Sequence, residues 1–235
     1  MTAAVAQRQA EPDHLVIFAT SLAEGVAWCE ATLGITPGPG GAHPLMGTHN
    51  RLFSIATPQF PRTYAEIIAI DTAAVPTRAA PLKRWFDLDS AALREQVQQY
   101  GPQLIHWVAN VPNLAHALGQ WQALGLDRGP AIAASRPTPR GLLEWQITVR
   151  DDGQRLFDGC LPTLIQWGAV HPAVHMPASG VTLQSLHLQH PEAPRLQAAC
   201  EALGLQHLQI QTGPAQLTAV LATPRGEVRL ASLLT

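Results

Sequence analysis

The pattern of apolar residues along the chain repeats three times. Between Ser21 and Gly34, apolar residues recur every three or four positions, which predicts an amphipathic helix that begins at a Ser-x-x-Glu capping box and ends at a Leu-Gly pair. The same pattern, with the same Leu-Gly ending, returns before Gly125 and before Gly204. Because an aliphatic residue follows each ending, the three helices indicate copies of one unit.

Each predicted helix follows an apolar strand and precedes further strand-like segments that are rich in β-branched residues. The leading strands span 14–19, 105–111 and 183–190. The sequence therefore predicts an α+β fold in which a βαβββ module occurs three times, with two modules paired around a cleft. Residues 76–102 carry prolines and one amphipathic run, so we expect a helical linker there and not a fourth module.

These elements divide the chain into five parts. We expect a disordered N-terminus at 1–11, a first module at 12–75, the helical linker at 76–102, a second module at 103–175 and a third, partly degenerate module at 176–235. The third module has no internal partner, so its apolar strands must be covered in another way. They pack either onto the back of the paired modules or against a second copy of the chain, and of these two we expect the isologous homodimer.

Composition narrows the classes of protein that fit. The 235 residues are 46% hydrophobic, which is enough to fill a core. The formal net charge of -2, with 14% charged residues, leaves no basic stretch for nucleic acid, and no apolar run is long enough for a membrane span or a signal peptide. Three cysteines without C-x-x-C spacing argue against a cysteine metal site and favour the cytoplasm.

Three segments of this repeat carry a family resemblance: "DHLVIFA" (13–19), "GGAHPLMGTHNRL" (40–52) and "YAEII" (64–68). Together with the βαβββ repeat, they resemble the glyoxalase-like branch of the vicinal oxygen chelate superfamily. The resemblance runs from about Asp13 to Pro172 and, more weakly, through the third copy. It implies two modules whose sheets curl around a cleft. In metal-binding members, each module supplies one ligand from its first strand and one from its last strand.

Carried over by position, the resemblance implies that His14 and Glu66 of the first module and His106 and Gln166 of the second are metal ligands. Gln166 stands where an acidic residue is more usual, which leaves His14, His106 and Glu66 as the stronger three. Two imidazoles and one carboxylate suit Zn, Ni, Fe or Mn better than Ca, which prefers an all-oxygen shell. The alternative is a metal-free core in which each histidine ring bonds a backbone carbonyl.

Two loops bound the implied cleft. In the first, His49 and Asn50 point to opposite faces of a strand, and we prefer Asn50 for the inside face and keep His49 as a second candidate. The alternative is a turn with solvated histidines. In the second loop, Arg136 and Arg140 can clamp a carboxylate or a phosphate of a substrate, or they can lie free in solvent.

The implied site favours three functions. With Glu66 as ligand or base, the first is a metal-dependent lyase or isomerase that abstracts a proton from a small carbonyl compound and stabilises the enolate. The second is an Fe(II) ring-cleaving dioxygenase, because such enzymes share the ligand set of two histidines and one carboxylate. The third is a metal-free protein that sequesters a small molecule. Trp107 and Trp145 are candidate walls of the cleft, with plain core as the alternative.

Overall fold

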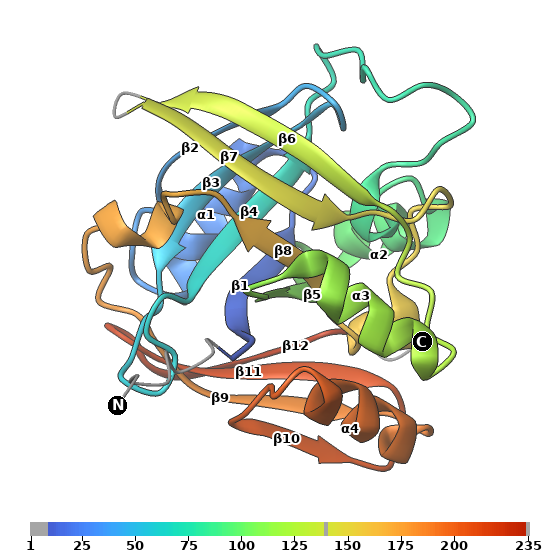
Figure 1. The fold of residues 1–235 in the computed structure, drawn as a ribbon. Coiled ribbons are helices and arrows are strands. Elements are labelled where there is room, and N and C mark those ends of the chain that lie inside the picture. The colour runs from blue at the N-terminus through green and yellow to red at the C-terminus, as the bar shows by residue number, and fades with distance from the viewer. Residues whose placement is uncertain (1–8, 139–140, 234–235) are drawn as a thin grey trace, which may run out of the picture.

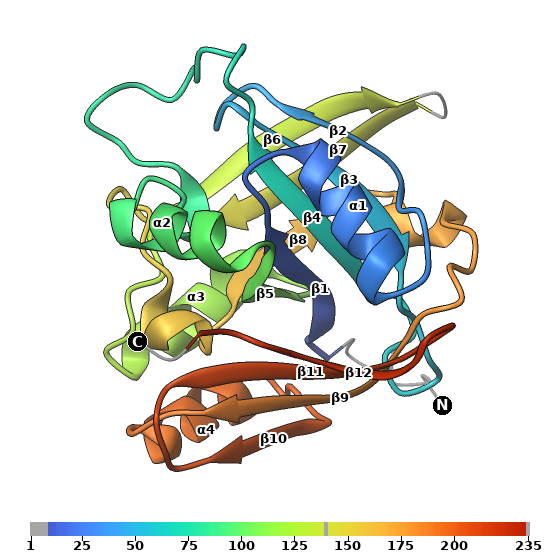
Figure 2. The ribbon, with the colours of Figure 1, turned by 180° about the vertical axis from the view of Figure 1, so that it is seen from behind.

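The computed structural model describes residues 9–138 and 141–233, and their strands form two sheets (Figures 1 and 2). The first module comprises β1 (Glu11–Phe18), α1 (Leu22–Thr32), β2 (Gly38–His43), β3 (Thr48–Ser54) and β4 (Tyr64–Ile70). Helix α1 begins at the predicted capping box, where the Ser21 side chain accepts a hydrogen bond from the backbone N–H of Glu24. It ends before Gly34, whose φ of 75° is accessible to glycine without strain. The local sequence thus sets both ends of this helix.

The second and third modules repeat this order of elements, and a linker precedes the second. The linker holds a short 3-10 turn, η1 (Trp85–Asp87), and helix α2 (Ala91–Tyr100). The second module comprises β5 (Gln103–Asn110), α3 (Leu114–Ala123), β6 (Ala131–Thr138), β7 (Gly141–Thr148), η2 (Leu156–Gly159) and β8 (Thr163–Trp167), and η3 (Pro172–His175) follows. The third comprises β9 (Thr182–Gln189), α4 (Ala193–Ala202), β10 (Leu208–Gln211), β11 (Gln216–Thr223) and β12 (Gly226–Ala231). The predicted α+β fold of βαβββ modules is confirmed, whereas the residue numbers at which the modules meet stay a prediction.

One eight-stranded sheet contains the first two modules, in the order β2-β3-β4-β1-β5-β8-β7-β6. The modules join through β1 and β5, which pair antiparallel and place Val16 opposite His106. In each module the last strand runs parallel to the first. The sheet curls so far that its two end strands approach each other. The Arg136 side chain on β6 lies against Gly41 on β2. The curl gives the sheet an enclosed concave face.

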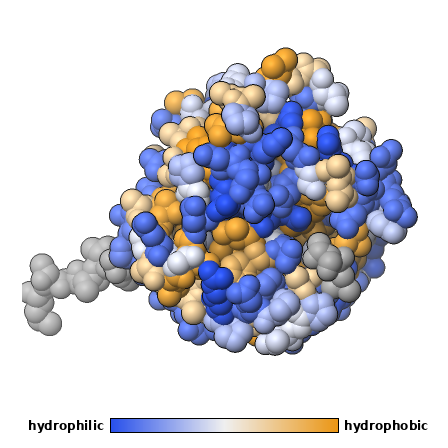
Figure 3. Space-filling view, turned by 90° about the vertical axis from the view of Figure 1, so that its right-hand side faces the viewer, coloured by the Kyte–Doolittle hydropathy of each residue, from blue (hydrophilic) through white to orange (hydrophobic). Residues whose placement is uncertain are grey.

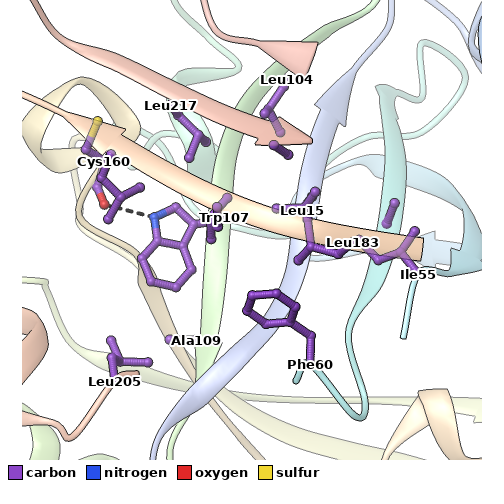
Figure 4. Close-up of a cluster of buried hydrophobic side chains, with 14 of the residues drawn as sticks. Leu15, Ile55, Phe60, Leu104, Trp107, Ala109, Cys160, Leu183, Leu205 and Leu217 are labelled. Carbon is purple, nitrogen blue, oxygen red and sulfur yellow. Dashed lines mark hydrogen bonds between the residues drawn. The ribbon is translucent and has the colours of Figure 1, made fainter. Parts of the chain in front are cut away.

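The largest core lies between the eight-stranded sheet and the third module. Leu15 and Trp107 from the large sheet belong to one cluster of buried side chains with Leu183 and Leu217 from the small sheet (Figure 4). The indole N–H of Trp107 donates to the carbonyl of Cys160 (2.8 Å), so this tryptophan is core and not a wall of the cleft. Since each large apolar side chain contributes about 1.5–3 kcal/mol when it is buried, this layer holds the three modules together.

The third module covers its apolar strand face within the same chain. Leu186 and Leu188 on β9 are buried, whereas Ser185 and His187, which alternate with them, are partly exposed. Helix α4 packs beside α3, where the indole N–H of Trp121 donates to the carbonyl of Ala199 (2.9 Å). Of the two predicted ways to cover this module, the structure shows packing onto the back of the paired modules. The apolar-face reason for a homodimer is therefore removed, and the dimer stays a prediction for light scattering to test.

The outer surface is largely polar on the face seen in Figure 3, where apolar residues form separate patches between hydrophilic ones. Across the described ranges, no helix combines the length and the hydropathy that crossing a bilayer requires. The longest of these helices, α1, has 11 residues.

Candidate functional site

A narrow cleft lies on the concave face of the large sheet, and the centre of a water-sized sphere can occupy about 40 Å³ of it. Its two sides differ in chemistry. The first module contributes most of the polar side chains, and the linker and the second module contribute most of the aromatic ones. The first module's polar residues are His14, His43, Asn50 and Glu66, and Arg136 comes from the second module. The aromatic residues of the linker and the second module are Trp85, Phe86, Trp145 and Trp167. Mostly apolar walls around a few polar groups are typical of a small-molecule site.

Glu66 is the most constrained acid of this cleft. Its side chain is buried, and its Oε1 accepts a hydrogen bond from the Nδ2 of Asn50 (2.6 Å). The backbone N–H of Gly41 donates in turn to the Oδ1 of Asn50 (2.7 Å). A Cβ on Gly40 would lie only 2.1 Å from that oxygen, so glycine is required there for close approach. The glycine pair on β2 therefore fixes Asn50, and Asn50 fixes the carboxylate.

His14 faces Glu66 and is oriented by Asp13. The Nε2 of His14 lies 3.6 Å from the Oε2 of Glu66, and its Nδ1 lies 2.6 Å from the Oδ1 of Asp13. The other Asp13 oxygen accepts hydrogen bonds from the indole N–H of Trp167 (2.8 Å) and the Nε2 of His171 (2.9 Å). Burial raises the pKa of Asp13, but the hydrogen bonds from both histidines outweigh it and hold that pKa well below its usual range. Asp13 is therefore a buried carboxylate that directs the Nε2 of His14 toward Glu66.

His43 lines the same side of the cleft as a neutral ring. Its Nε2 lies 3.3 Å from the Nδ2 of Asn50, and its Nδ1 lies 3.1 Å from the Oγ1 of Thr48. Burial lowers the pKa of His43 to about 4, although nearby Glu66 opposes the shift. At neutral pH this ring is thus uncharged and shares the Asn50 amide with the carboxylate.

His106 does not join His14 and Glu66 as a ligand, which corrects the prediction. The ring is fully buried, and its Nδ1 lies 3.0 Å from the carbonyl oxygen of Gly159. Its Nε2 accepts from the backbone N–H of Thr163 (3.2 Å) and lies 3.2 Å from the Nη2 of Arg128. Burial, and then the charge of Arg128, lower the pKa of His106 well below its usual value. A metal ion at Nε2 would be repelled by the guanidinium that already lies there.

Gln166 points away from the cleft, because Ile165 and Trp167 on either side of it line the cleft. Its Oε1 accepts a hydrogen bond from the backbone N–H of Leu114 (2.7 Å), at the start of α3. The strand ladders identify Thr163 as the residue equivalent to Glu66: Glu66 pairs with Val16 on β1, and Thr163 pairs with Val108 on β5. Val16 lies two residues after His14, and Val108 lies two residues after His106. The position equivalent to Glu66 is therefore Thr163, three residues before the predicted Gln166.

The remaining predicted residues divide between the cleft and other places. Arg136 and Trp145 line the cleft, and the Trp145 ring lies 5.6 Å from that of Trp167. His49 lies on the other face of β3, where its Nδ1 is 3.9 Å from a carboxylate oxygen of Asp71. Arg140 lies outside the described residues.

The donors in the cleft do not fit a metal ion with three or four protein ligands. Among residues 9–138 and 141–233, no group of three His, Cys, Asp or Glu side chains is placed to hold one. At the two positions where the second module would supply metal ligands, it has Thr163 and His106, and the His106 ring lies against Arg128. Only the Nε2 of His14 and the Oε2 of Glu66 face each other, and two protein ligands are fewer than such sites use.

Three functional features were not predicted from the sequence. Asp13 was missed because strict alternation turns it away from His14, whereas a register shift in the β1–β5 pairing between Pro12 and His14 brings the two side chains together. Trp85 and Phe86 were missed because they come from the linker. A repeated Arg-x-Phe-Asp motif, at 84–87 and 155–158, was the available signal. Both copies place Phe and Asp at positive φ, between 51° and 59°.

The comparisons with known proteins agree with this fold. A model of the glyoxalase-like domain matches residues 13–204. A hypothetical protein from Staphylococcus aureus superposes with a TM-score of 0.58 at 12% identity, over 94% of this chain and 85% of that chain. A search of the curated proteins gave no match.

Two solved epimerases are more distant. Methylmalonyl-CoA epimerase from Mycobacterium tuberculosis gives a TM-score of 0.37 at 13% identity, over 71% of this chain and 91% of that chain. A Streptomyces coelicolor methylmalonyl-CoA epimerase in complex with 2-nitronate-propionyl-CoA gives 0.41 at 14%, over 70% and 97%. These superpositions are too loose to carry an argument about chemistry. The family match covers most of the chain, and the chain belongs to the glyoxalase-like domain family of the vicinal oxygen chelate superfamily.

Proposed function

We propose that the cleft binds a small carbonyl compound and removes a proton from the carbon next to the carbonyl, as a lyase or an isomerase does. One observation carries the proposal: a buried carboxylate, Glu66, lines the cleft with one oxygen held by Asn50 and the other facing the Nε2 of His14. A positioned base near its target proton contributes about 10²- to 10⁴-fold to a rate.

Glu66 is the base in this proposal. The hydrogen bond from Asn50 occupies Oε1, so Oε2 is the oxygen that accepts the proton. Burial in an aromatic cleft excludes water, which strengthens the interaction between the carboxylate and the substrate. The electron pair released from the C–H bond moves onto the carbonyl oxygen as an enolate.

His14 stabilises that enolate oxygen. In its protonated form, the Nε2–H donates to the developing negative charge, while the Nδ1–H donates to Asp13. The buried Asp13 carboxylate lies against Nδ1 and keeps the ring in one orientation. Return of the proton from Glu66 to a neighbouring atom of the enolate gives isomerisation, whereas return to the same face of the same carbon restores the substrate.

This proposal needs no metal ion. The resemblance implied Zn, Ni, Fe or Mn, but the cleft offers His14 and Glu66 without the two donors expected from the second module. The ring-cleaving dioxygenase is less well supported for the same reason, because within 9–138 and 141–233 its ligand set of two histidines and one carboxylate is not assembled. Elemental analysis of protein purified without added metal is expected to give far less than one equivalent.

Sequestration of a small molecule is the second candidate. It is supported by the aromatic walls, in which Trp145 and Trp167 lie with ring centroids 5.6 Å apart. Large aromatic surfaces bind flat apolar molecules without chemistry. The two candidates differ in whether the bound molecule exchanges protons with water.

Solvent deuterium exchange separates them. A panel of aldehydes, ketones and 2-oxo acids is incubated in D₂O, and the loss of the C–H signal next to the carbonyl is followed by proton NMR. The wild type is expected to accelerate exchange for at least one compound, and Glu66→Gln to remove about 10²- to 10⁴-fold of that rate. Glu95→Gln, on the exposed face of α2, is the matched control and should leave the rate unchanged.

Two results would contradict the proposal. Saturable binding without exchange for every compound in the panel would favour sequestration. One equivalent of bound metal that is lost in Glu66→Gln would restore the metal-dependent enzyme.

A further inference from the structure

Arg136 extends across the cleft from one end of the curled sheet to the other. Its side chain starts on β6, lines the cleft, and reaches the backbone of Gly41 on β2. A Cβ on Gly41 would lie 2.1 Å from the Nη1 of Arg136, so the absence of a side chain at Gly41 makes room for the guanidinium. The absence of a side chain at Gly41 thus makes room for Arg136, as its absence at Gly40 makes room for Asn50.

The Nη1 of Arg136 is buried and has no hydrogen-bond partner among the described residues. The indole N–H of Trp85, which lines the same cleft, is also buried and without a partner there. Both groups lie near β2: the Trp85 ring packs edge-on against His43, with centroids 5.0 Å apart, and His43 follows Gly41 by two residues. Two buried hydrogen-bond donors without partners, on Arg136 and Trp85, therefore lie near β2 in the same cleft.

Buried donors without partners are costly, and a charged one is the most costly. Nearby carboxylates do not satisfy these two: the Oε1 of Glu66 is bonded to Asn50, and Asp13 is bonded to His14, His171 and Trp167. A guanidinium with a free N–H presents donors that match an oxyanion, and the Trp85 indole N–H in the same cleft is a second donor without a partner. The arrangement is therefore complementary to a ligand with a negatively charged group of oxygens.

We propose that the ligand of this cleft is anionic, with a carboxylate or a phosphate that binds Arg136 and Trp85 and so aims its reactive carbon at Glu66. The part of this inference that concerns the reacting carbon rests on the proposed function. The anion site rests only on Arg136, Trp85 and Gly41. A substrate held at one end by Arg136 and at the other by His14 is oriented at two points, which is what proton abstraction from one carbon requires.

The test compares a carboxylate ligand with its uncharged ester and with a free phosphate ion. Phenylpyruvate, its uncharged methyl ester and inorganic phosphate are titrated separately into the wild type by calorimetry, with the indole N–H signals followed by NMR. Variants are Arg136→Met, Arg136→Lys and Gly41→Ala, which displaces the guanidinium without changing Arg136 itself. Arg94→Met, on the exposed face of α2, is the matched control. Thermal unfolding of each variant checks that it folds.

We expect the wild type to bind phenylpyruvate about tenfold or more tightly than its ester, which is the effect of one charge-assisted hydrogen bond. Arg136→Met and Gly41→Ala should remove the preference, Arg136→Lys should restore part of it, and Arg94→Met should keep it. Tighter binding of inorganic phosphate than of phenylpyruvate would assign a phosphate group to the ligand, and the reverse would assign a carboxylate.

The anion site and the proposed function fail in different ways. Glu66→Gln should abolish deuterium exchange and keep the preference for the charged ligand. If the wild type binds neither probe at millimolar concentration, or if Arg136→Met keeps the preference, the anion site is wrong even where exchange is normal. If the preference is present and exchange is absent, the anion site is right and the proton abstraction is wrong.

Discussion

The two modules that form the cleft carry a histidine at equivalent positions and differ in what faces it. In the first module, the Nε2 of His14 faces the carboxylate of Glu66 at 3.6 Å, and both residues line the cleft. In the second, the Nε2 of His106 lies 3.0 Å from the hydroxyl of Thr163, and Phe86 packs over the ring with centroids 5.3 Å apart. Equivalent positions therefore give a polar site in one module and a sealed core in the other.

A repeated module can thus hold a polar site in one copy and packed core at the equivalent position of the other. A threonine hydroxyl is no base at neutral pH, so the second module has no counterpart of the base proposed in the first. Arg128, from the segment after α3, places its own positive charge at the histidine nitrogen, where a metal ion would otherwise bind. The backbone carbonyl of Gly159 holds the remaining ring nitrogen. The histidine that lines the cleft in the first module thus corresponds to a histidine that stabilises the core in the second.

Removing the two histidines should separate these roles most strongly. His106→Ala deletes a fully buried ring and removes one of the partners of Arg128, so we expect the free energy of unfolding to fall by about 3–5 kcal/mol. His14→Ala, at the cleft, should cost less stability. Urea denaturation of both variants measures the difference, and equal losses would show that the two histidines are not distinct in role.

The carboxylate behind His14 gives the next largest effect. Asp13→Asn keeps the shape of the side chain but removes the charge that orients and stabilises the ring, so we expect deuterium exchange to slow by about 100-fold. The NMR signal of the His14 Nδ1–H should move at the same time. A normal exchange rate together with a shifted signal would show that Asp13 is structural only.

The pH dependence of stability gives a smaller and more gradual effect. Since the pKa of folded His106 is well below that of an unfolded histidine, the unfolded chain takes up more protons as the pH falls below about 6.5. Stability is therefore expected to fall with pH below that value, by up to about 1.4 kcal/mol per pH unit from this histidine, and His43 adds in the same direction until it titrates. His106→Gln should flatten the slope in urea denaturation, and an unchanged slope would assign it to other groups.

The sequence predicted those parts of the molecule that depend on local pattern. Helical spacing and strand alternation are short-range properties, so the modules followed from them, whereas the choice of Glu66 followed from the family resemblance. The roles of His106 and Gln166 depend on long-range contacts. Arg128 reaches His106 from another segment, and Gln166 caps the helix α3 on the opposite face. Neither contact leaves a trace in the residues around the histidine or the glutamine.

Asp13 and the glycine pair show a second limit. A register shift beside Asp13 overrides the strict alternation of the strand, and only the pairing with β5 reveals it. The φ angles of Gly40 and Gly41 are not positive, and the absence of a side chain at each leaves the space that Asn50 and Arg136 occupy. Close approach between distant side chains is a property of the fold and is invisible in a single segment.

The measurement that tests this account most directly compares deuterium exchange in Glu66→Gln and Thr163→Val under identical conditions. The two residues occupy equivalent ladder positions, one in each module. We expect Glu66→Gln to lower the exchange rate by about 10²- to 10⁴-fold, and Thr163→Val to leave it close to the wild-type value while stability falls. A wild-type rate in Glu66→Gln, or an equal loss of rate in both variants, would contradict the claim that only the first module retained the chemistry.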